Sequence, residues 1–209
     1  MNLPENALVL FQGDSITDAG RLRDVPEDLG RGYALMAAAQ YSLRHPEHKV
    51  RFLNRGISGN RAADLVARWQ ADCLDLRPDL LSIYIGINDT WRRYDRGLLT
   101  TAAEFEDHYR QLLAAARRAL PAVRLVLVEP FVLPVPADRT AWREDLDPKL
   151  AVVRALALEY RAALVPLDSL FAQAACRREP AFWAADGVHP SPAGHALIAQ
   201  AWLEAVERL

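Results

Sequence analysis

Two short motifs at opposite ends of the chain carry a serine, an aspartate and a histidine. Gly13-Asp14-Ser15 follows an apolar run, and Asp186 stands three residues before His189 in a stretch broken by glycine and proline. A serine hydroxyl is a weak nucleophile at neutral pH and needs a neighbouring base. A histidine base works best when a carboxylate holds its ring. These residue types predict a Ser15, His189 and Asp186 triad for acyl transfer.

Gly59 and Asn88 are two further positions that could take part in this chemistry. Ligands of open α/β sheets bind beyond the carboxyl ends of the strands. Ser15, Gly59 and Asn88 each follow a predicted strand, and Asp186 and His189 lie in the last loop before the final helix. We therefore expect all five residues at one rim of the sheet.

Each of these motifs, taken singly, also has a structural interpretation. Gly-Asp-Ser after a strand is often a turn with a helix cap, a glycine can simply supply a positive φ angle, and Asp-x-x-His can be a surface ion pair. The order of the motifs and their placement at strand ends agree with one another, and this agreement favours the catalytic interpretation.

Short apolar runs alternate along the chain with longer segments of helical period. The predicted strands are 7–11, 50–54, 80–85, 123–129 and 163–167. The predicted helices are 33–44, 61–76, 103–120, 147–160 and 191–208. This alternation is typical of a parallel sheet covered on both faces, and we predict an α/β protein with a five-stranded parallel sheet in a three-layer α/β/α sandwich. The prediction is one domain over residues 1–209, with two long irregular stretches, 17–32 and 131–146, as functional loops.

The composition excludes several classes of partner. The chain has 209 residues, 51% of them apolar and 25% charged, with a formal net charge of −2. Such a balance, without a basic run, argues against nucleic acid and anionic membranes as partners. The N-terminus has no signal-peptide pattern, and no apolar run reaches the roughly 18 residues of a spanning helix. We therefore expect a soluble, cytoplasmic protein.

Only His189, among the five histidines, lies in a predicted strand-end loop close to a preceding carboxylate. His45 and His48 fall in a polar helix-to-strand connection and are expected to be solvated. His108 is expected on the exposed face of a helix, and His195 as a packed residue of the last helix. Neither the histidines nor the two cysteines show metal-ligand spacing, and no glycine-rich nucleotide loop is present. We expect no cofactor and no metal.

These residues resemble the SGNH hydrolases, also called GDSL esterases, whose four name-giving residues match Ser15, Gly59, Asn88 and His189 in order. The resemblance covers nearly the whole chain and implies a flavodoxin-like fold and a serine esterase. It assigns the oxyanion hole to the backbone N–H groups of Ser15 and Gly59 and to the side-chain amide of Asn88. Several strings are also similar to bacterial intracellular acetylxylan esterases of that family: GDSITDAGR, NRGISGN, RWQAD, IGINDTWRRYD and DGVHPSPAGH.

The resemblance to those esterases implies an acetyl ester of a xylan-derived or other oligosaccharide as substrate, and it leaves a homo-oligomer open. The candidate substrate-binding residues beside the motifs are Trp91, Arg92, Tyr94 and Trp183. Their aromatic rings could stack on sugars or simply pack in the core. No long apolar segment suggests a lid or an acyl-chain tunnel, which favours a small acyl group. The alternatives are a general short-chain carboxylesterase, a thioesterase, a lysophospholipase and a non-catalytic carbohydrate-binding module.

Overall fold

A five-stranded sheet forms the centre of the protein, whose computed structural model describes residues 3–209. The strands are β1 (Leu8–Gly13), β2 (Arg51–Asn54), β3 (Leu80–Tyr84), β4 (Arg124–Val128) and β5 (Ala163–Val165). Their order in the sheet is β2-β1-β3-β4-β5, and every neighbouring pair is parallel. The five-stranded parallel sheet predicted from the sequence is confirmed.

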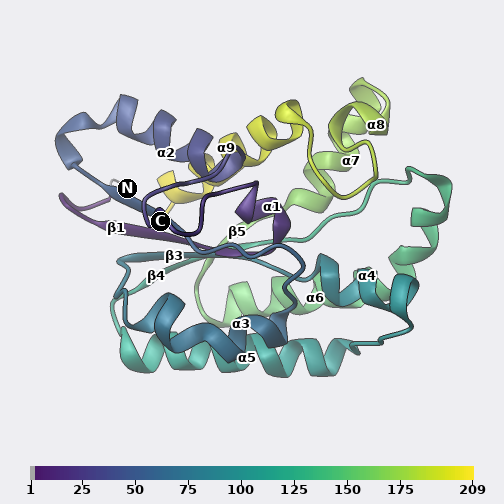
Figure 1. The fold of residues 1–209 in the computed structure, drawn as a ribbon, viewed down its shortest axis with the longest axis horizontal. Coiled ribbons are helices and arrows are strands. Elements are labelled where there is room, and N and C mark those ends of the chain that lie inside the picture. Colours follow the sequence, from purple (N-terminus) through teal and green to yellow (C-terminus); the bar gives the residue numbers. More distant parts are fainter. Residues whose placement is uncertain (1–2) are drawn as a thin grey trace.

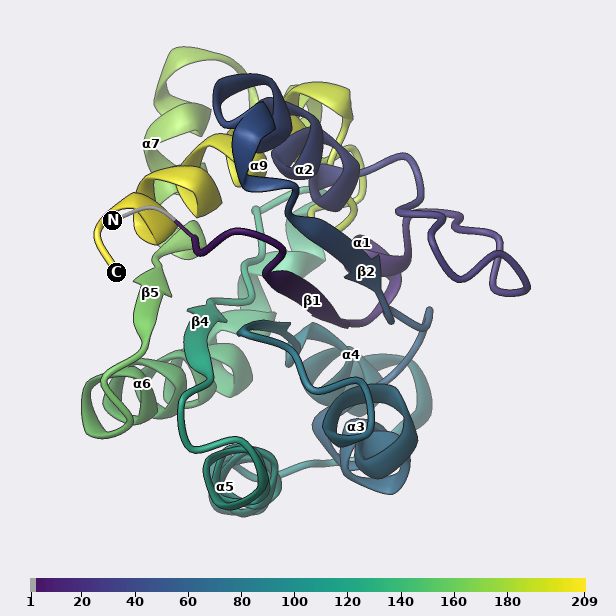
Figure 2. The ribbon, with the colours of Figure 1, turned by 90° about the vertical axis from the view of Figure 1, so that its left-hand side faces the viewer.

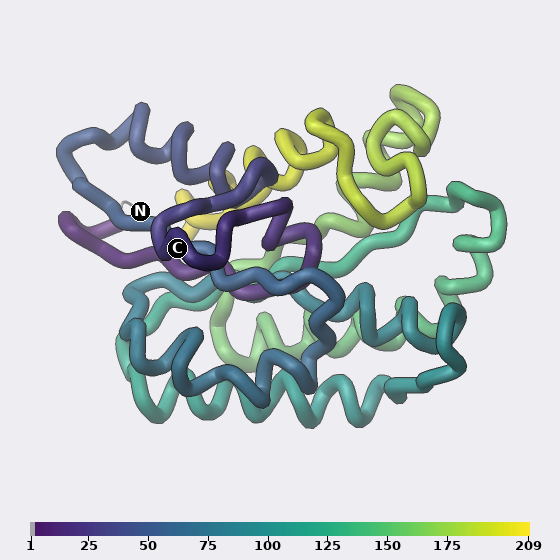
Figure 3. The backbone as a smooth tube through the Cα atoms, in the orientation of Figure 1, coloured from purple at the N-terminus to yellow at the C-terminus, as the bar shows by residue number. Residues whose placement is uncertain are grey.

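Helices cover both faces of this sheet, and the predicted three-layer α/β/α sandwich is confirmed (Figures 1 and 2). One face carries α2 (Tyr33–Arg44), α7 (Leu167–Arg177) and α9 (Pro192–Glu207), and the other carries α3 (Ala62–Trp69), α5 (Ala102–Ala119) and α6 (Arg143–Glu159). Helices α2 and α9 lie side by side (Figure 3). Among the described residues, no helix is both long and apolar enough to cross a membrane.

The strands supply two separate hydrophobic cores because successive side chains point to opposite faces of a sheet. Val9 and Phe11 of β1 are buried in the core that includes residues of α2 and α9, and Leu10 between them is buried in the core that includes residues of α3 and α5. Trp202 of α9 is fully buried, and its Nε1 donates a hydrogen bond to Ser82 Oγ of β3 over 3.0 Å. Burial on both faces explains why the central strands β1 and β3 are mostly apolar in the sequence.

The remaining elements are short or were not predicted. They are α1 (Ser15–Asp18), the 3₁₀ turns η1 (Pro46–His48) and η3 (Ala137–Trp142), the π-helical turn η2 (Gln70–Leu74), α4 (Ile87–Arg96) and α8 (Pro180–Trp183). The helix predicted over 61–76 is observed as α3, which ends at Trp69, and the π-helical turn η2, which continues it to Leu74. Helix α6 begins at Arg143 rather than at 147, so Pro148 lies inside the helix instead of in its first turn.

Candidate active site

Ser15, His189 and Asp186 are in contact beyond the carboxyl ends of the strands. Ser15 Oγ lies 3.0 Å from His189 Nε2, and His189 Nδ1 lies 2.6 Å from Asp186 Oδ2. The two ends of the sequence therefore meet in the order hydroxyl, imidazole, carboxylate. In this order the imidazole can accept the hydroxyl proton while the carboxylate holds its other nitrogen.

Ser15 is held at the start of a short helix directly after β1. Asp14 is the N-cap of α1, and its Oδ1 accepts a hydrogen bond from the backbone N–H of Ile16 over 3.0 Å. The N-cap role of Asp14 agrees with the interpretation of Gly-Asp-Ser as a turn with a helix cap. That interpretation is compatible with a catalytic role for Ser15. A Cβ at Gly13 would clash with the backbone oxygen of Tyr84 in the neighbouring strand. The motif thus needs glycine for close strand packing and aspartate for the turn that presents Ser15.

The Asp186 carboxylate is fixed through both of its oxygens. Oδ1 accepts hydrogen bonds from the backbone N–H groups of Val188 (3.0 Å) and His189 (2.7 Å), which leaves Oδ2 for the imidazole. The loop must curl tightly to bring residues three apart together, and Gly187 has a positive φ of 81°. A Cβ there would clash with the backbone oxygens of Leu133 and Val135, so no other residue fits.

Hydrogen bonds and burial set the protonation of the four titratable groups around Ser15. Burial raises the pKa of Asp186, but the hydrogen bonds from the His189 ring and from backbone N–H groups outweigh burial and hold the pKa well below its usual value. The hydrogen bond to Asp186 in turn raises the pKa of His189, although burial opposes the shift. Complete burial raises the pKa of Asp14 to about 7. Burial lowers the pKa of His195 to about 4.

Gly59 and Asn88 line the same small cavity as Ser15 and His189. The cavity has a volume of about 250 Å³, and its lining also includes Ser58, Trp91, Arg92 and Asp95. Gly59 adopts a φ of 84° in the loop after β2, and Asn88 is the second residue of α4, the helix after β3. Four of the five predicted site residues thus line one cavity, and the fifth, Asp186, is bonded to one of them.

Two polar side chains hold the loops that carry these residues. Asn54 Nδ2 donates to the backbone oxygens of Thr17 and Leu29, and its Oδ1 accepts from the N–H of Gly56 over 2.8 Å. Asp89 is buried, accepts from the N–H of Ala62 and has a pKa raised by burial to about 7. Both carry out in the fold the loop-supporting role that short polar side chains commonly take.

The candidate substrate-binding residues fall into two groups. Trp91 and Arg92 line the cavity, and the Trp91 ring lies 5.6 Å from the His189 ring, centroid to centroid. Tyr94 instead stacks on Trp142, with centroids 5.2 Å apart, and its hydroxyl donates to the backbone oxygen of Ala141. The position of Tyr94 fits the packing interpretation.

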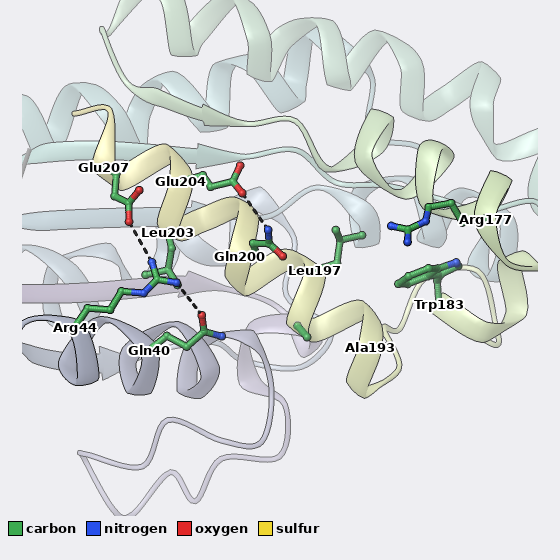
Figure 4. A pocket seen from close by; sticks show the side chains of 11 residues that line it. Gln40, Arg44, Arg177, Trp183, Ala193, Leu197, Gln200, Leu203, Glu204 and Glu207 are labelled. Carbon is green, nitrogen blue, oxygen red and sulfur yellow. Dashed lines mark hydrogen bonds and ion pairs between the residues drawn. The ribbon is translucent and has the colours of Figure 1, made fainter.

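Trp183 belongs to a different surface feature from the catalytic cavity. It lines a groove of about 670 Å³ between α2, α7, α8 and α9, which Figure 4 shows with Trp183 and Arg177 at one end and Arg44 and Gln40 at the other. Its predicted contact with a substrate held at Ser15 finds no support in this position. Trp183 stands three residues before Asp186 in the sequence, but the local pattern does not indicate in which direction its side chain points.

Arg139 is a site residue that the sequence analysis missed. Its guanidinium lies over the rings of Trp91 (5.1 Å to the centroid) and Trp142 (4.1 Å), and its Nε donates to the backbone oxygen of Asp186 over 3.3 Å. It therefore connects the wall of the cavity to the loop that carries the carboxylate. The only signal in the sequence was its place within the irregular stretch 131–146.

Comparisons with known proteins give a consistent result. Residues 11–197 match the model of the GDSL-like lipase/acylhydrolase family. The chain is 35% identical over 212 residues to an acetylxylan esterase of Geobacillus stearothermophilus, covering 99% of this chain and 96% of that protein.

Solved structures are similar over nearly the whole chain. A putative GDSL-like lipase from Parabacteroides merdae has a TM-score of 0.95 and 38% identity, covering 99% of this chain and 98% of that one. An acetylxylan esterase from G. stearothermophilus has a TM-score of 0.88 and 33% identity, covering 99% and 96%. Catalytic mutants of the latter esterase replace a serine, an aspartate or a histidine by alanine.

Proposed function

Because this chain belongs to the GDSL-like lipase/acylhydrolase family and is a carboxylic ester hydrolase, we propose that it removes acetyl groups from oligosaccharides derived from xylan. The observation that carries the proposal is the contact of Ser15 with His189, and of His189 with Asp186, at the edge of a cavity of about 250 Å³. Serine is the nucleophile, histidine the base, and aspartate the group that orients the histidine.

In the first half of the reaction, Ser15 Oγ attacks the ester carbonyl carbon as His189 Nε2 takes the hydroxyl proton. The carboxylate of Asp186 stabilises the imidazolium that forms and keeps the other ring nitrogen protonated. The tetrahedral intermediate then collapses, the carbon–oxygen bond to the sugar breaks, and His189 returns its proton to the departing hydroxyl. An acetyl-serine remains.

In the second half, water replaces the serine hydroxyl as nucleophile. His189 takes a proton from the water while its oxygen attacks the acetyl carbonyl, and a second tetrahedral intermediate forms. Its collapse breaks the bond to Ser15 Oγ, which takes back the proton from His189, and releases acetic acid, which loses its own proton to water and becomes acetate. The resting enzyme is restored without any cofactor.

The negative oxygen of each intermediate is stabilised by three donors. These are the backbone N–H groups of Ser15 and Gly59 and the side-chain amide of Asn88, and all three residues line the cavity. One such donor is worth about 3 kcal/mol of transition-state stabilisation, or 100- to 1,000-fold in rate. Asn88 donates without adding a formal charge to the resting site.

The dimensions of the cavity favour a small acyl group. Cavities for drug-sized ligands have volumes of about 300 to 1,000 Å³, and this one lies below that range. Trp91 and Arg92 at its wall are suited to the sugar that carries the ester, because an indole offers an apolar face and a guanidinium offers several N–H donors. The acetylxylan esterase from G. stearothermophilus, with 35% identity, supports the same substrate class.

A panel of substrates tests the proposal against its alternatives. Acetylated xylo-oligosaccharides and p-nitrophenyl acetate should be hydrolysed, whereas p-nitrophenyl esters of long acids, acyl-CoA and lysophospholipids should be poor substrates. A preference for long acyl chains or thioesters would favour the lysophospholipase or thioesterase alternative. The non-catalytic carbohydrate-binding module is set aside because the chain is a carboxylic ester hydrolase.

The role of Ser15 has a separate test. An organophosphonate should label the wild-type chain once and inactivate it, and the label should be absent from Ser15→Ala. Labelling of Ser58, the other serine that lines the cavity, would show that the nucleophile was misassigned.

A further inference from the structure

The connection between α2 and β2 brings three metal-ligating side chains together. His45 ends α2 as its C-cap, and Pro46–His48 forms the 3₁₀ turn η1. One donor atom from each of His45, Glu47 and His48 lies within 4.8 Å of the other two. Glu47 Oε1 is 3.3 Å from His48 Nε2 and 3.8 Å from His45 Nδ1.

We propose that His45, Glu47 and His48 bind one divalent transition metal ion, with Zn²⁺ as the best match. Zinc prefers tetrahedral sites with bonds of about 2.0 to 2.2 Å to nitrogen and oxygen, so its ligand atoms lie about 3.3 Å apart. The donor atoms here already have that spacing or need to close by at most about 1.5 Å. Two imidazoles and one carboxylate leave the fourth position for water. Imidazole ligands disfavour Mg²⁺ and Ca²⁺, which prefer oxygen.

The two histidines are held in place rather than free in solvent. Their side chains are only 24% and 16% exposed. The ring of His45 lies 4.8 Å from that of Tyr41 and is stacked on that of His48, with centroids 4.9 Å apart and an interplanar angle of 5°. The expectation that both histidines are solvated was therefore wrong, because Tyr41 packs against them. Because an imidazole binds a metal through a lone pair in its ring plane, one of the two rings must turn when both bind one ion.

Tyr41 also supplies the partner that a ligating imidazole commonly has. Its Oη lies 3.0 Å from His48 Nδ1 and accepts a hydrogen bond from the N–H of Leu3. With a proton on Nδ1 donated to Tyr41 Oη, the lone pair of Nε2 is available to the metal. A hydrogen-bond partner on the second nitrogen fixes the tautomer and ring orientation of a metal-bound histidine.

The position of the cluster points to stabilisation rather than catalysis. In a parallel sheet the connection that enters β2 lies at the amino ends of the strands, and the loops that follow the strands lie at the carboxyl ends. Figure 1 shows this connection at the left, away from α1 and α4. The backbone oxygen of His48 accepts from the N–H of Asn6 over 2.7 Å. A bound ion would thus tie the end of α2 to the start of β2 and to the N-terminal segment.

Titration of the metal-free full chain with Zn²⁺ tests the proposal. Calorimetry should show one saturable site, and Zn²⁺ at 100 times its Kd should raise the Tm by about 5–10 °C, whereas Mg²⁺ should not. His45→Gln and His48→Gln should lose both effects, and Tyr41→Phe should weaken binding about 10-fold or more. His108→Gln is the matched control and should behave as the wild type.

The readout is the difference that Zn²⁺ makes within each variant, so a variant that is less stable without metal still gives an answer. An unchanged Zn²⁺ affinity and Tm shift in His45→Gln and His48→Gln would place the metal elsewhere and overturn the proposal. The absence of saturable Zn²⁺ binding to the wild type would also overturn the proposal, because the cluster would then be a set of side-chain contacts only. Esterase activity is not the readout, so the result is independent of the proposed reaction.

Discussion

Asn88 Nδ2 donates a hydrogen bond to the backbone oxygen of Asn60, 3.1 Å away. This contact joins helix α4 to the loop directly after Gly59, and so ties two of the three proposed oxyanion donors together. Arg92 Nη2 lies 3.5 Å from Asn88 Oδ1 and holds the other end of the amide. An amide nitrogen carries two hydrogens, so one remains for the oxyanion when the other is bonded to Asn60.

Asn88→Ala should therefore reduce kcat by about 100- to 1,000-fold with little change in KM, because the lost hydrogen bond is strongest in the transition state. Steady-state kinetics with p-nitrophenyl acetate provide the measurement. Asn60→Ala is a matched control, since it keeps the backbone oxygen that accepts from Asn88, and we expect a change of less than about 10-fold. A raised KM with unchanged kcat would make Asn88 a binding residue.

Trp91→Leu should raise the KM for acetylated xylo-oligosaccharides by up to about 10-fold, because contacts of an aromatic ring are worth about 0.5–1.5 kcal/mol. The KM for p-nitrophenyl acetate, which has no sugar, should change much less. Trp183→Leu is the matched control, as Trp183 lines the groove beside α9 instead of the catalytic cavity. Equal effects of both substitutions on the sugar substrate would extend the binding surface to that groove.

The positions of Ser15, Gly59 and Asn88 were predictable because each follows a segment with the pattern of a strand, and the runs before Ser15 and Asn88 are buried. Topology then places all carboxyl ends at one edge, whatever the details of packing. Helix α4 was not predicted, because Gly86, with a φ of 131°, breaks the pattern between β3 and Ile87. The sequence gives the strand ends more reliably than the short elements that follow them.

Contacts between distant segments could not be read from local pattern. The stacking of Arg139 on Trp91 joins two segments almost fifty residues apart, and neither shows a motif that names the other. The His45, Glu47 and His48 cluster was missed for a different reason. Its spacing matches no standard metal motif, and only the 3₁₀ turn brings the three donor atoms together.

The chain has two lysines, and they should differ sharply in their effect on stability. Lys149 is fully buried in α6 and pairs with the buried Asp145. Lys149→Met removes one partner of a buried ion pair, which costs about 3 kcal/mol of unfolding free energy. Lys49, which pairs with Glu5 in solvent, is the matched control, and Lys49→Met should cost less than about 1 kcal/mol.

Urea denaturation, monitored by circular dichroism, measures the loss of unfolding free energy in Lys149→Met and in Lys49→Met. Asp145 retains an ion pair with Arg93 in the Lys149→Met variant, at 3.2 Å, and this places the expected cost at the lower end of the range for buried pairs. A loss of stability as small as that of Lys49→Met would mean that Arg93 alone compensates the buried Asp145 carboxylate.

The activity should fall in acid as His189 becomes protonated, because the base must be neutral to take the serine proton. The hydrogen bond that His189 donates to Asp186 raises the pKa of His189 above 6.5, so kcat/KM should begin to decline at a pH above 6.5 and then fall about 10-fold per pH unit. Asp186→Asn removes the charge that raises this pKa. Its decline should move to lower pH, and its kcat should fall by about 10⁴-fold, as in other triads.

Asp14 is the group that could imitate this behaviour, since burial raises its pKa to about 7, in the same range. Asp14→Asn separates the two. If His189 is the titrating base, the acid decline persists in Asp14→Asn and moves only slightly to lower pH, because the Asp14 charge makes a minor contribution to the raised pKa of His189. If Asp14 were the titrating group instead, the acid decline would vanish in Asp14→Asn, and in Asp186→Asn it would occur at the same pH as in the wild type. His195→Gln should leave the profile unchanged, because the pKa of His195 is about 4 and the ring stays neutral over this range.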